Sequence, residues 1–330
     1  MKSSGLLIVM STVAITRACT ANQSALGAQG APAIHLEQLI IGFITMCFVV
    51  WILVMTALAW GLLRDRSIQG WRPSDQRLTA IVAFAVGATV IVISGLTIWS
   101  FLTTRNIGSP DAAGLTIMVR GKQWWWQVVY TDPDPSRSFE TANEIHIPVG
   151  QDVRIVLEAS DVIHSFWVPS LAGKQDMIPG RSNALLLRAE RPGIYRGQCA
   201  EFCGLQHSHM AIAVIAESPG EFEQWAAAQR SDGVSSEEPD AVAGKVTFLA
   251  KPCAACHTVR GTPAKGKTGP DLTHVADRAT IATGLLETTR GSLAAWIADP
   301  QTLKPGNNMP VVPLSSVELR NISAYMESLK

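Results

Sequence analysis

The sequence predicts a chain of three different parts: a two-helix transmembrane hairpin, an all-β sandwich and a small all-α domain. Three observations favour this fold class. Apolar residues are concentrated in the first part of the chain, short β-type runs between glycine and proline turns occupy the middle, and helical patterns fill the end. The boundaries are residues 1–33 (signal peptide and N-terminal segment), 34–106 (hairpin), 107–217 (β domain), 218–240 (helix and linker) and 241–330 (α domain).

Composition agrees with a membrane-linked protein. Only 16% of the 330 residues are charged. The apolar excess lies mainly in the first hundred residues, which explains the composition without a large apolar core in the rest of the chain. The formal net charge is zero, so nothing electrostatic favours nucleic acid as a partner. Membrane lipid is the partner that the apolar runs predict.

Two apolar runs, Ile34–Leu63 and Leu78–Leu102, each exceed the ~20 residues that cross a bilayer. A short basic loop joins them, and basic loops stay on the cytoplasmic side. Its arginines are Arg64, Arg66, Arg72 and Arg77. We therefore expect two membrane spans, with the N-terminus and everything after the second run on the outer face. Two buried core helices are the competing interpretation.

The N-terminus has features of a signal peptide. Met1-Lys2 is a short charged start, and the apolar core runs from Leu6 to Ile15. Cys19 follows Ala18, as at a lipoprotein cleavage site. Lipidation of Cys19 and an uncleaved N-terminus both remain open.

The middle of the chain contains closely spaced strand patterns, which are typical of a β-sandwich or barrel. These are Leu115–Val119, Trp124–Tyr130, Glu144–Pro148, Val153–Ala159, Ala184–Ala189, Gly193–Gln198 and Met210–Ala216. The end of the chain contains helical patterns around a polar linker at Ser231–Asp240. The predicted helices are Ser218–Arg230, Ala241–Leu249, Ser292–Ala298 and Ser316–Leu329.

Two thiols, an imidazole and a thioether lie within twelve residues, at Cys199, Cys203, His207 and Met210. Soft sulfur with imidazole is a ligand set that suits copper, and each thiolate can bridge two metal ions. We expect His207 and a remote histidine to cap the metals and Met210 to be a weak axial ligand. His164, at a strand end with apolar neighbours, is the candidate for the remote histidine. A disulfide is the alternative for the cysteine pair.

A second redox motif lies further along the chain. Cys253-Ala254-Ala255-Cys256-His257 is the attachment motif of a c-type haem, in which two thiols bond to the haem and the histidine binds the iron. Met309 is the expected sixth ligand, with Met326 as the alternative. A redox disulfide is the competing interpretation of the two cysteines.

Three segments together resemble subunit II of the haem–copper cytochrome c oxidases. They are the ligand loop, Asp161–Leu171 and Gly121–Trp126. The resemblance covers Ile34–Ala216 and implies a cupredoxin-like Greek-key fold with a binuclear copper centre, CuA. The segment Gly269–Leu272 resembles the loop beside the proximal histidine of class I cytochromes c, which implies that fold for the α domain.

The resemblance also implies roles for individual residues. The backbone carbonyl of Glu201 completes the CuA ligands, and its carboxylate binds Mg or Mn where subunit I meets this chain. Trp124 matches the tryptophan that passes electrons to CuA. Trp125 stands where tyrosine is commoner. Asp75 aligns loosely with a glutamate at the mouth of a proton path, although a plain interfacial acid fits equally well.

A subunit II with a C-terminal cytochrome c is typical of the bacterial caa-type oxidases. That resemblance implies electron transfer from cytochrome c, or another upstream cytochrome, through haem c and CuA to subunit I. There oxygen is reduced to water with proton pumping, and subunit III is a further expected partner. The alternatives are a CuA-bearing subunit of a nitric oxide or nitrous oxide reductase, and a membrane-anchored copper carrier or redox sensor.

Overall fold

The computed structural model describes residues 23–63, 74–105, 107 and 113–330. The predicted signal peptide with Cys19, and the loop arginines Arg64, Arg66 and Arg72, lie outside the described residues. The chain forms two units: a helical hairpin over 34–108, and a second unit that contains the β and α domains. Each unit is described by itself.

The hairpin unit consists of two long apolar helices, α2 (Ala31–Leu63) and α3 (Asp75–Arg105). At 1.5 Å per residue both exceed the ~30 Å hydrocarbon core of a bilayer, and both are apolar enough to cross it. The hydroxyls of Thr45 and Thr89 donate to carbonyls one turn earlier, so these polar groups are satisfied within the helix. Asp75 is the first residue of α3.

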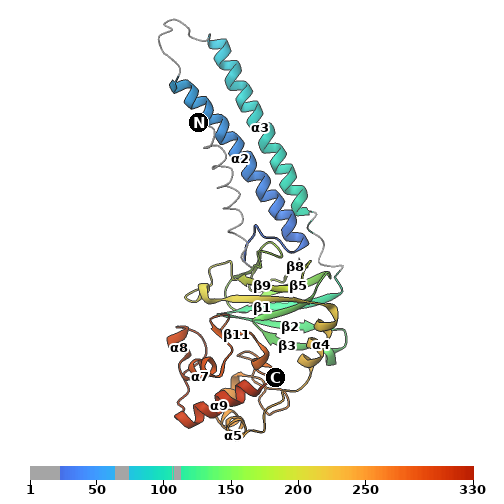
Figure 1. Ribbon diagram of the computed structural model, residues 1–330, viewed down its shortest axis with the longest axis vertical. Coiled ribbons are helices and arrows are strands. Elements are labelled where there is room, and N and C mark those ends of the chain that lie inside the picture. The colour runs from blue at the N-terminus through green and yellow to red at the C-terminus, as the bar shows by residue number, and fades with distance from the viewer. Residues whose placement is uncertain (1–22, 64–73, 106, 108–112) are drawn as a thin grey trace, which may run out of the picture. The chain divides into compact units, whose positions relative to one another are not determined.

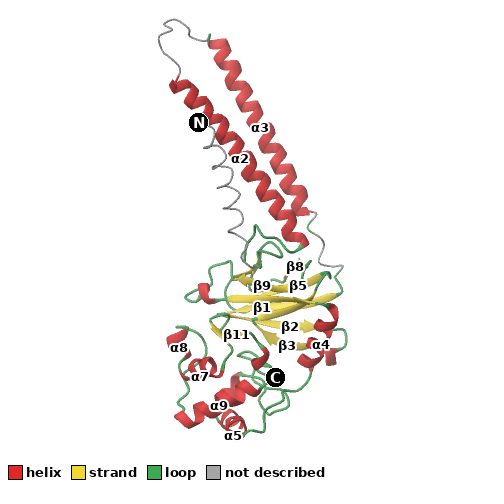
Figure 2. Cartoon of the chain, viewed as in Figure 1, coloured by secondary structure: helices red, strands yellow, loops and turns green. Residues whose placement is uncertain are grey.

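The β domain is a sandwich of two main sheets (Figure 2). One sheet has the order β3-β2-β1-β5-β8 and the other β4-β10-β9. In each sheet one strand pairs in parallel with a strand distant in sequence, β1 with β5 and β10 with β4, and the chain crosses to the other sheet between the two partners. The strands are β1 (Leu115–Lys122), β2 (Trp125–Thr131), β3 (Phe139–Ala142), β4 (Glu144–Pro148), β5 (Val153–Ala159), β8 (Asn183–Leu187), β9 (Gly193–Gln198) and β10 (Ala211–Glu217).

A separate two-stranded pair, β6 (His164–Phe166) and β7 (Gln175–Met177), lies beside this sandwich. All seven predicted strands are present with small shifts at their ends. The sequence analysis missed β3, β6 and β7, which have three or four residues each. Runs this short carry too little alternation to be recognised.

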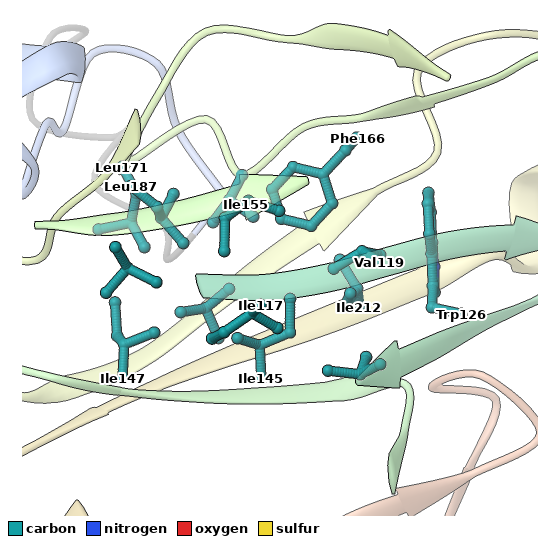
Figure 3. Close-up of a cluster of buried hydrophobic side chains, with 14 of the residues drawn as sticks. Ile117, Val119, Trp126, Ile145, Ile147, Ile155, Phe166, Leu171, Leu187 and Ile212 are labelled. Carbon is teal, nitrogen blue, oxygen red and sulfur yellow. The ribbon is translucent and has the colours of Figure 1, made fainter. Parts of the chain in front are cut away.

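The core of the sandwich follows from strand alternation. Along β1 every second side chain is buried, including Ile117 and Val119, and their opposite neighbours are partly exposed. Figure 3 shows these side chains with Trp126, Ile155 and Phe166 in one continuous apolar cluster. The ring of Phe166 meets Trp126 edge-on, at 6.1 Å between centroids. This rigid core lies directly behind the residues of the predicted copper site.

The α domain follows helix α4 (Pro219–Arg230), whose N-terminus is held by a Ser218–Glu221 capping box. Helix α9 packs against α5 and α7 (Figure 1). A short pair of strands, β11 (Thr280–Ile281) and β12 (Leu286–Glu287), faces the β domain through its connecting loop. The helices are α5 (Pro239–Ala250), α6 (Cys253–Cys256), α7 (Arg290–Ala298), α8 (Pro300–Leu303) and α9 (Ser316–Ser328). The two long apolar helices, the β-sandwich and the helical end of the chain confirm the predicted fold class.

Candidate metal and haem centres

The predicted copper loop connects β9 to β10 and is closed by the strands on either side. The Cys199 amide donates to the Met210 carbonyl at 2.9 Å, which continues the β9–β10 ladder across the base of the loop. The Ala200 amide donates to Ser165 in β6 at 3.0 Å, which fixes the loop beside His164. Backbone hydrogen bonds therefore bring a remote histidine to a loop that lies 35 residues further along the chain.

Four side chains form a connected row. The Cys199 and Cys203 sulfurs lie 3.7 Å apart. Nδ1 of His164 lies 3.9 Å from the Cys199 sulfur, and Nδ1 of His207 lies 3.5 Å from the Cys203 sulfur. Atoms bound to one first-row metal ion at ~2.0–2.3 Å lie roughly 3–4 Å apart. The spacing thus fits metal ions between neighbouring ligands, with one histidine at each end of a sulfur pair.

Two further predicted ligands complete the set. Sδ of Met210 lies 3.8 Å from the Cys203 sulfur, and the backbone oxygen of Glu201 lies 3.3 Å from the Cys199 sulfur. The Glu201 carboxylate is turned toward Lys174 instead, at 3.8 Å from its Nζ, and is 44% exposed. The backbone oxygen of Glu201 therefore faces the sulfur pair, whereas its side chain faces solvent and Lys174.

Burial and charge prepare the thiols for metal binding. Both cysteines are about 2% exposed. The hydrogen bond between the sulfurs lowers the pKa of Cys199 to about 3, with a smaller contribution from His164, while it raises the pKa of Cys203. Cys199 is thus the thiol of the pair that loses its proton more readily, although burial raises the pKa of both. A site that holds a thiolate without metal suits a soft cation.

His164 is oriented by groups that the sequence analysis did not single out. Its Nε2 lies 2.8 Å from the Asp161 carboxylate, so Nδ1 is the nitrogen that faces the sulfur. Burial opposes protonation, but the Asp161 and Cys199 contacts raise the pKa of His164 overall. A Cβ on Gly121 would lie 2.8 Å from the imidazole, so the ring packs against bare backbone of β1.

The predicted haem ligands surround an apolar cavity in the α domain. Cys253 and Cys256 occupy one helical turn, and the backbone amide of His257 donates to the Cys253 carbonyl at 3.0 Å. All three residues and both candidate methionines, Met309 and Met326, line the cavity. The shape and its apolar lining fit a haem attached through the two thiols.

The hydrogen bond of His257 to the backbone leaves its other ring nitrogen, Nε2, available to bind iron. Nδ1 lies 2.8 Å from the Pro270 carbonyl, and burial lowers the pKa of the ring, which keeps it in the neutral form that binds metals. A Cβ on Gly269 would approach the ring to 2.6 Å. A glycine therefore lies against His164, a predicted copper ligand, and another lies against His257, the predicted haem ligand.

The remaining candidates lie in different surroundings. Trp124 is in the β1–β2 turn and its indole donates to the Cys203 carbonyl at 3.0 Å. Exposed His209 contacts the Gln206 side chain at 2.8 Å and lies outside the row of ligands. His146 in β4 is partly buried, lies 2.6 Å from the Glu217 carboxylate and stacks on Trp225 with ring centroids 3.9 Å apart.

The sequence analysis also missed Lys304, whose amine reaches the Trp124 carbonyl from the α domain. A single lysine in a loop has no spacing that would identify it. Asp161 had a local signal, because a carboxylate three residues before a histidine can reach its ring.

Comparison with known families identifies both domains. The profile described as "Cytochrome C oxidase subunit II, periplasmic domain" matches residues 115–217, and the profile described as "Cytochrome c" matches residues 241–330. These matches imply copper at the first domain and haem c at the second. Together with the geometry, they define a class of electron-transfer proteins that join a CuA-type domain to a cytochrome c.

Three curated relatives are described as cytochrome c oxidase subunit 2. The protein of Alkalihalophilus pseudofirmus is 37% identical over 70% of this chain and 66% of its own length. That of Bacillus subtilis is 33% identical over 68% and 64%, and that of Bacillus sp. strain PS3 is 30% identical over 73% and 72%. The chain thus spans slightly less than two thirds of the first two relatives. It belongs to the cytochrome c oxidase subunit 2 family, as the resemblance implied.

Proposed function

We propose that this chain is the electron-accepting subunit II of a bacterial haem–copper oxidase of the caa type. It receives electrons at its cytochrome domain and delivers them through the copper domain to subunit I, where oxygen is reduced to water and protons are pumped. When bound, haem c and the copper pair supply one-electron chemistry without transfer of atoms. The chain's own residues hold these groups, orient them and keep water away.

The row His164–Cys199–Cys203–His207 carries this proposal. Two adjacent sulfurs with a histidine at each end suit a pair of metal ions better than one ion. The rigid β-sandwich behind them restricts movement of the ligands, which favours rapid electron transfer. Met210 is fully buried next to Cys203 and would be a weak thioether ligand of the copper pair.

Burial of the ligands argues against a copper carrier. His164 and Met210 have 0% exposure and the two cysteines about 2%, whereas His207 is partly exposed. A carrier must exchange its metal with a partner, which needs ligands that a second protein can reach. The same burial suits a resident centre that exchanges electrons alone.

Further parts of the proposal concern partners and membrane orientation. The exposed Glu201 carboxylate binds Mg or Mn at the surface that meets subunit I. Subunit III and a donor cytochrome c complete the assembly. Helices α2 and α3 anchor the chain in the plasma membrane, with the loop between them in the cytoplasm and both redox domains on the outer face, because that loop is basic.

The test is electron paramagnetic resonance of the full chain matured with copper and haem, together with a count of both. We expect two coppers sharing one unpaired electron, one covalent haem, and copper that resists a mild chelator. A single-copper signal, or copper that is lost to the chelator, would contradict the proposal and favour the carrier. Oxygen consumption with nitric oxide and nitrous oxide as competing substrates separates the oxidase from the reductases.

A further inference from the structure

Lys304 is a buried lysine that joins the two redox domains. It follows α8, is 2% exposed, and its Nζ lies 2.8 Å from the carbonyls of both Trp124 and His209 in the β domain. In its own domain Nζ lies 3.0 Å from the Thr283 hydroxyl and 3.3 Å from the Ala282 carbonyl. One amine therefore lies within hydrogen-bond distance of four acceptor oxygens that come from both domains.

Such a group is costly to bury unless its hydrogen bonds are made. Burial lowers the pKa of Lys304 to about 7. The amine has hydrogens to donate in either protonation state. Its surroundings thus supply the acceptors that make burial of Lys304 possible, and half of them belong to the copper domain.

The loop between β11 and β12 strengthens the same contact. The Thr283 hydroxyl donates to the Trp124 carbonyl at 2.9 Å, and the Ala211 amide donates to the Thr283 carbonyl at 3.3 Å. Ala282 and Thr283 both have left-handed backbones, with φ of 52° and 65°. Non-glycine residues hold this conformation when surrounding contacts enforce it, and the contacts here cross the domain boundary.

A second point of attachment lies away from the copper loop. The buried Glu144 carboxylate in β4 accepts from the Ala279 amide at 2.8 Å. Arg278, which is also buried, donates to the Thr141 hydroxyl at 3.4 Å. Two separated attachments resist rotation of one domain on the other.

These contacts enclose Trp124. Its indole is bonded to the Cys203 carbonyl of the copper loop, and its ring also lines the haem cavity. It is 8% exposed. A Cβ on Gly306 of the cytochrome domain would lie 3.7 Å from the ring, so the cytochrome domain covers this face closely.

We propose that Lys304 is a positioning residue that fastens the cytochrome domain over the Trp124 turn of the same chain. That face is thereby closed to a soluble cytochrome and is reserved for the chain's own haem domain. A soluble donor must deliver its electron to another side of the cytochrome domain. This inference rests on the proposed function. When both groups are bound, the step would be the transfer of one electron from ferrous haem to the oxidised copper pair without a proton, and this chain's residues would hold the two groups in place.

The first test measures docking without relying on redox activity. Lys304→Met in the full chain keeps the side-chain length and removes the donor. Lys265→Met, at an exposed lysine of the same domain, is the matched control. We expect hydrogen exchange at the Ala211 amide, which bonds across the boundary, to rise at least about tenfold in Lys304→Met. The Ala213 amide, bonded to Asn143 within the β domain, should be unchanged. Equal exchange in both variants would overturn the proposal.

The second test measures electron transfer within the assembled oxidase after photochemical reduction of the haem. Lys304→Met should slow transfer to copper at least about tenfold, with unaltered haem and copper spectra, whereas Lys265→Met should match the wild type. Wild-type transfer that fails altogether would refute the proposed function. Rapid transfer in both the wild type and Lys304→Met would refute the role of Lys304 alone.

If Lys304→Met fails to fold, a second variant tests the same contact. Thr283→Ala deletes the hydroxyl that accepts from Lys304 and donates to the Trp124 carbonyl. It should raise exchange at Ala211 and slow transfer in the same direction. The absence of both effects would count against the interface.

Discussion

The copper region and the haem region prepare for their cofactors in opposite ways. In the copper region, the ligand side chains already lie 3.5–3.9 Å from one another within a packed apolar core. In the haem region, the ligands line a cavity whose walls include core residues such as Phe248, Leu293 and Ile322. One site is nearly complete as protein alone, and the other is completed by its cofactor.

The difference teaches where each domain obtains its stability. The sandwich buries its core between two sheets. We therefore expect the stability of the β domain to depend little on copper. The cytochrome domain has a small core, and several of its residues also line the haem cavity, so a bound haem adds apolar contacts to that core. Haem in that domain is therefore part of the core as well as a redox group.

The largest expected effect is loss of the haem attachment. The double variant Cys253→Ser and Cys256→Ser should lack covalent haem, and its cytochrome domain should lose at least ~3 kcal/mol of its free energy of unfolding because the cavity is unfilled. Calorimetry and hydrogen exchange at α5 and α9 measure this loss.

Copper removal is the matched comparison for that variant. Removal of copper with a chelator under non-denaturing conditions should leave amide hydrogen exchange in β1 and β5 nearly unchanged. A copper-free β domain as unstable as the haem-free α domain would break the contrast between the two sites.

The next effect concerns the sulfur pair. Cys199→Ser should abolish the shared-electron copper spectrum, because one bridging thiolate is replaced by a poor ligand for copper. The fold should persist, since the surrounding sheets are unaffected. Electron paramagnetic resonance with a copper count measures the outcome, and an unchanged spectrum would rule out a bridging role for Cys199.

A smaller effect is expected at the sixth haem position. Met309→Ala should leave the haem attached through its two thiols and change only the iron's coordination and potential. Met326→Leu is the control, because Met326 lies in α9 and lines the same cavity. Optical spectra distinguish the two, and an altered spectrum in Met326→Leu alone would transfer the assignment to that residue.

The smallest effect is a pH dependence of the β domain. Burial lowers the pKa of His146 from 6.5 to about 3. The unfolded chain therefore binds the proton first, and stability falls as pH decreases from 6.5 toward 3. Roughly 2 kcal/mol should be lost between pH 6.5 and pH 5.

His146→Gln provides the control for that measurement. Its stability should vary less with pH over the same range, as denaturant titrations at each pH would record. An equal slope in the variant and the wild type would assign the acid sensitivity to other groups.

Most elements could be predicted because their signals are local. The apolar runs of α2 and α3, the alternation in β1 and β5 and the amphipathic pattern of α9 each lie within one segment. The analysis missed β11, β12, α6 and α8, which have two to four residues each. These short elements form because neighbouring segments hold them, and their own sequences give almost no periodicity.

The candidate ligands could be predicted from the sequence alone. Cys199, Cys203, His207 and Met210 share a single loop, and Cys253, Cys256 and His257 share a single turn, so their spacing limits which atoms can meet. The choice of cofactor follows from their chemistry, since soft sulfur with imidazole favours copper and paired thiols with an adjacent histidine favour haem.

Only the tertiary structure decided how distant segments meet. The pairing of His164 with Cys199 depends on β6 lying beside the copper loop, and the bonds of Lys304 to Trp124 and His209 depend on how two domains pack. Contacts across 35 or 180 residues have no local pattern, because they arise from strand register and from the burial of surfaces that the chain encodes separately.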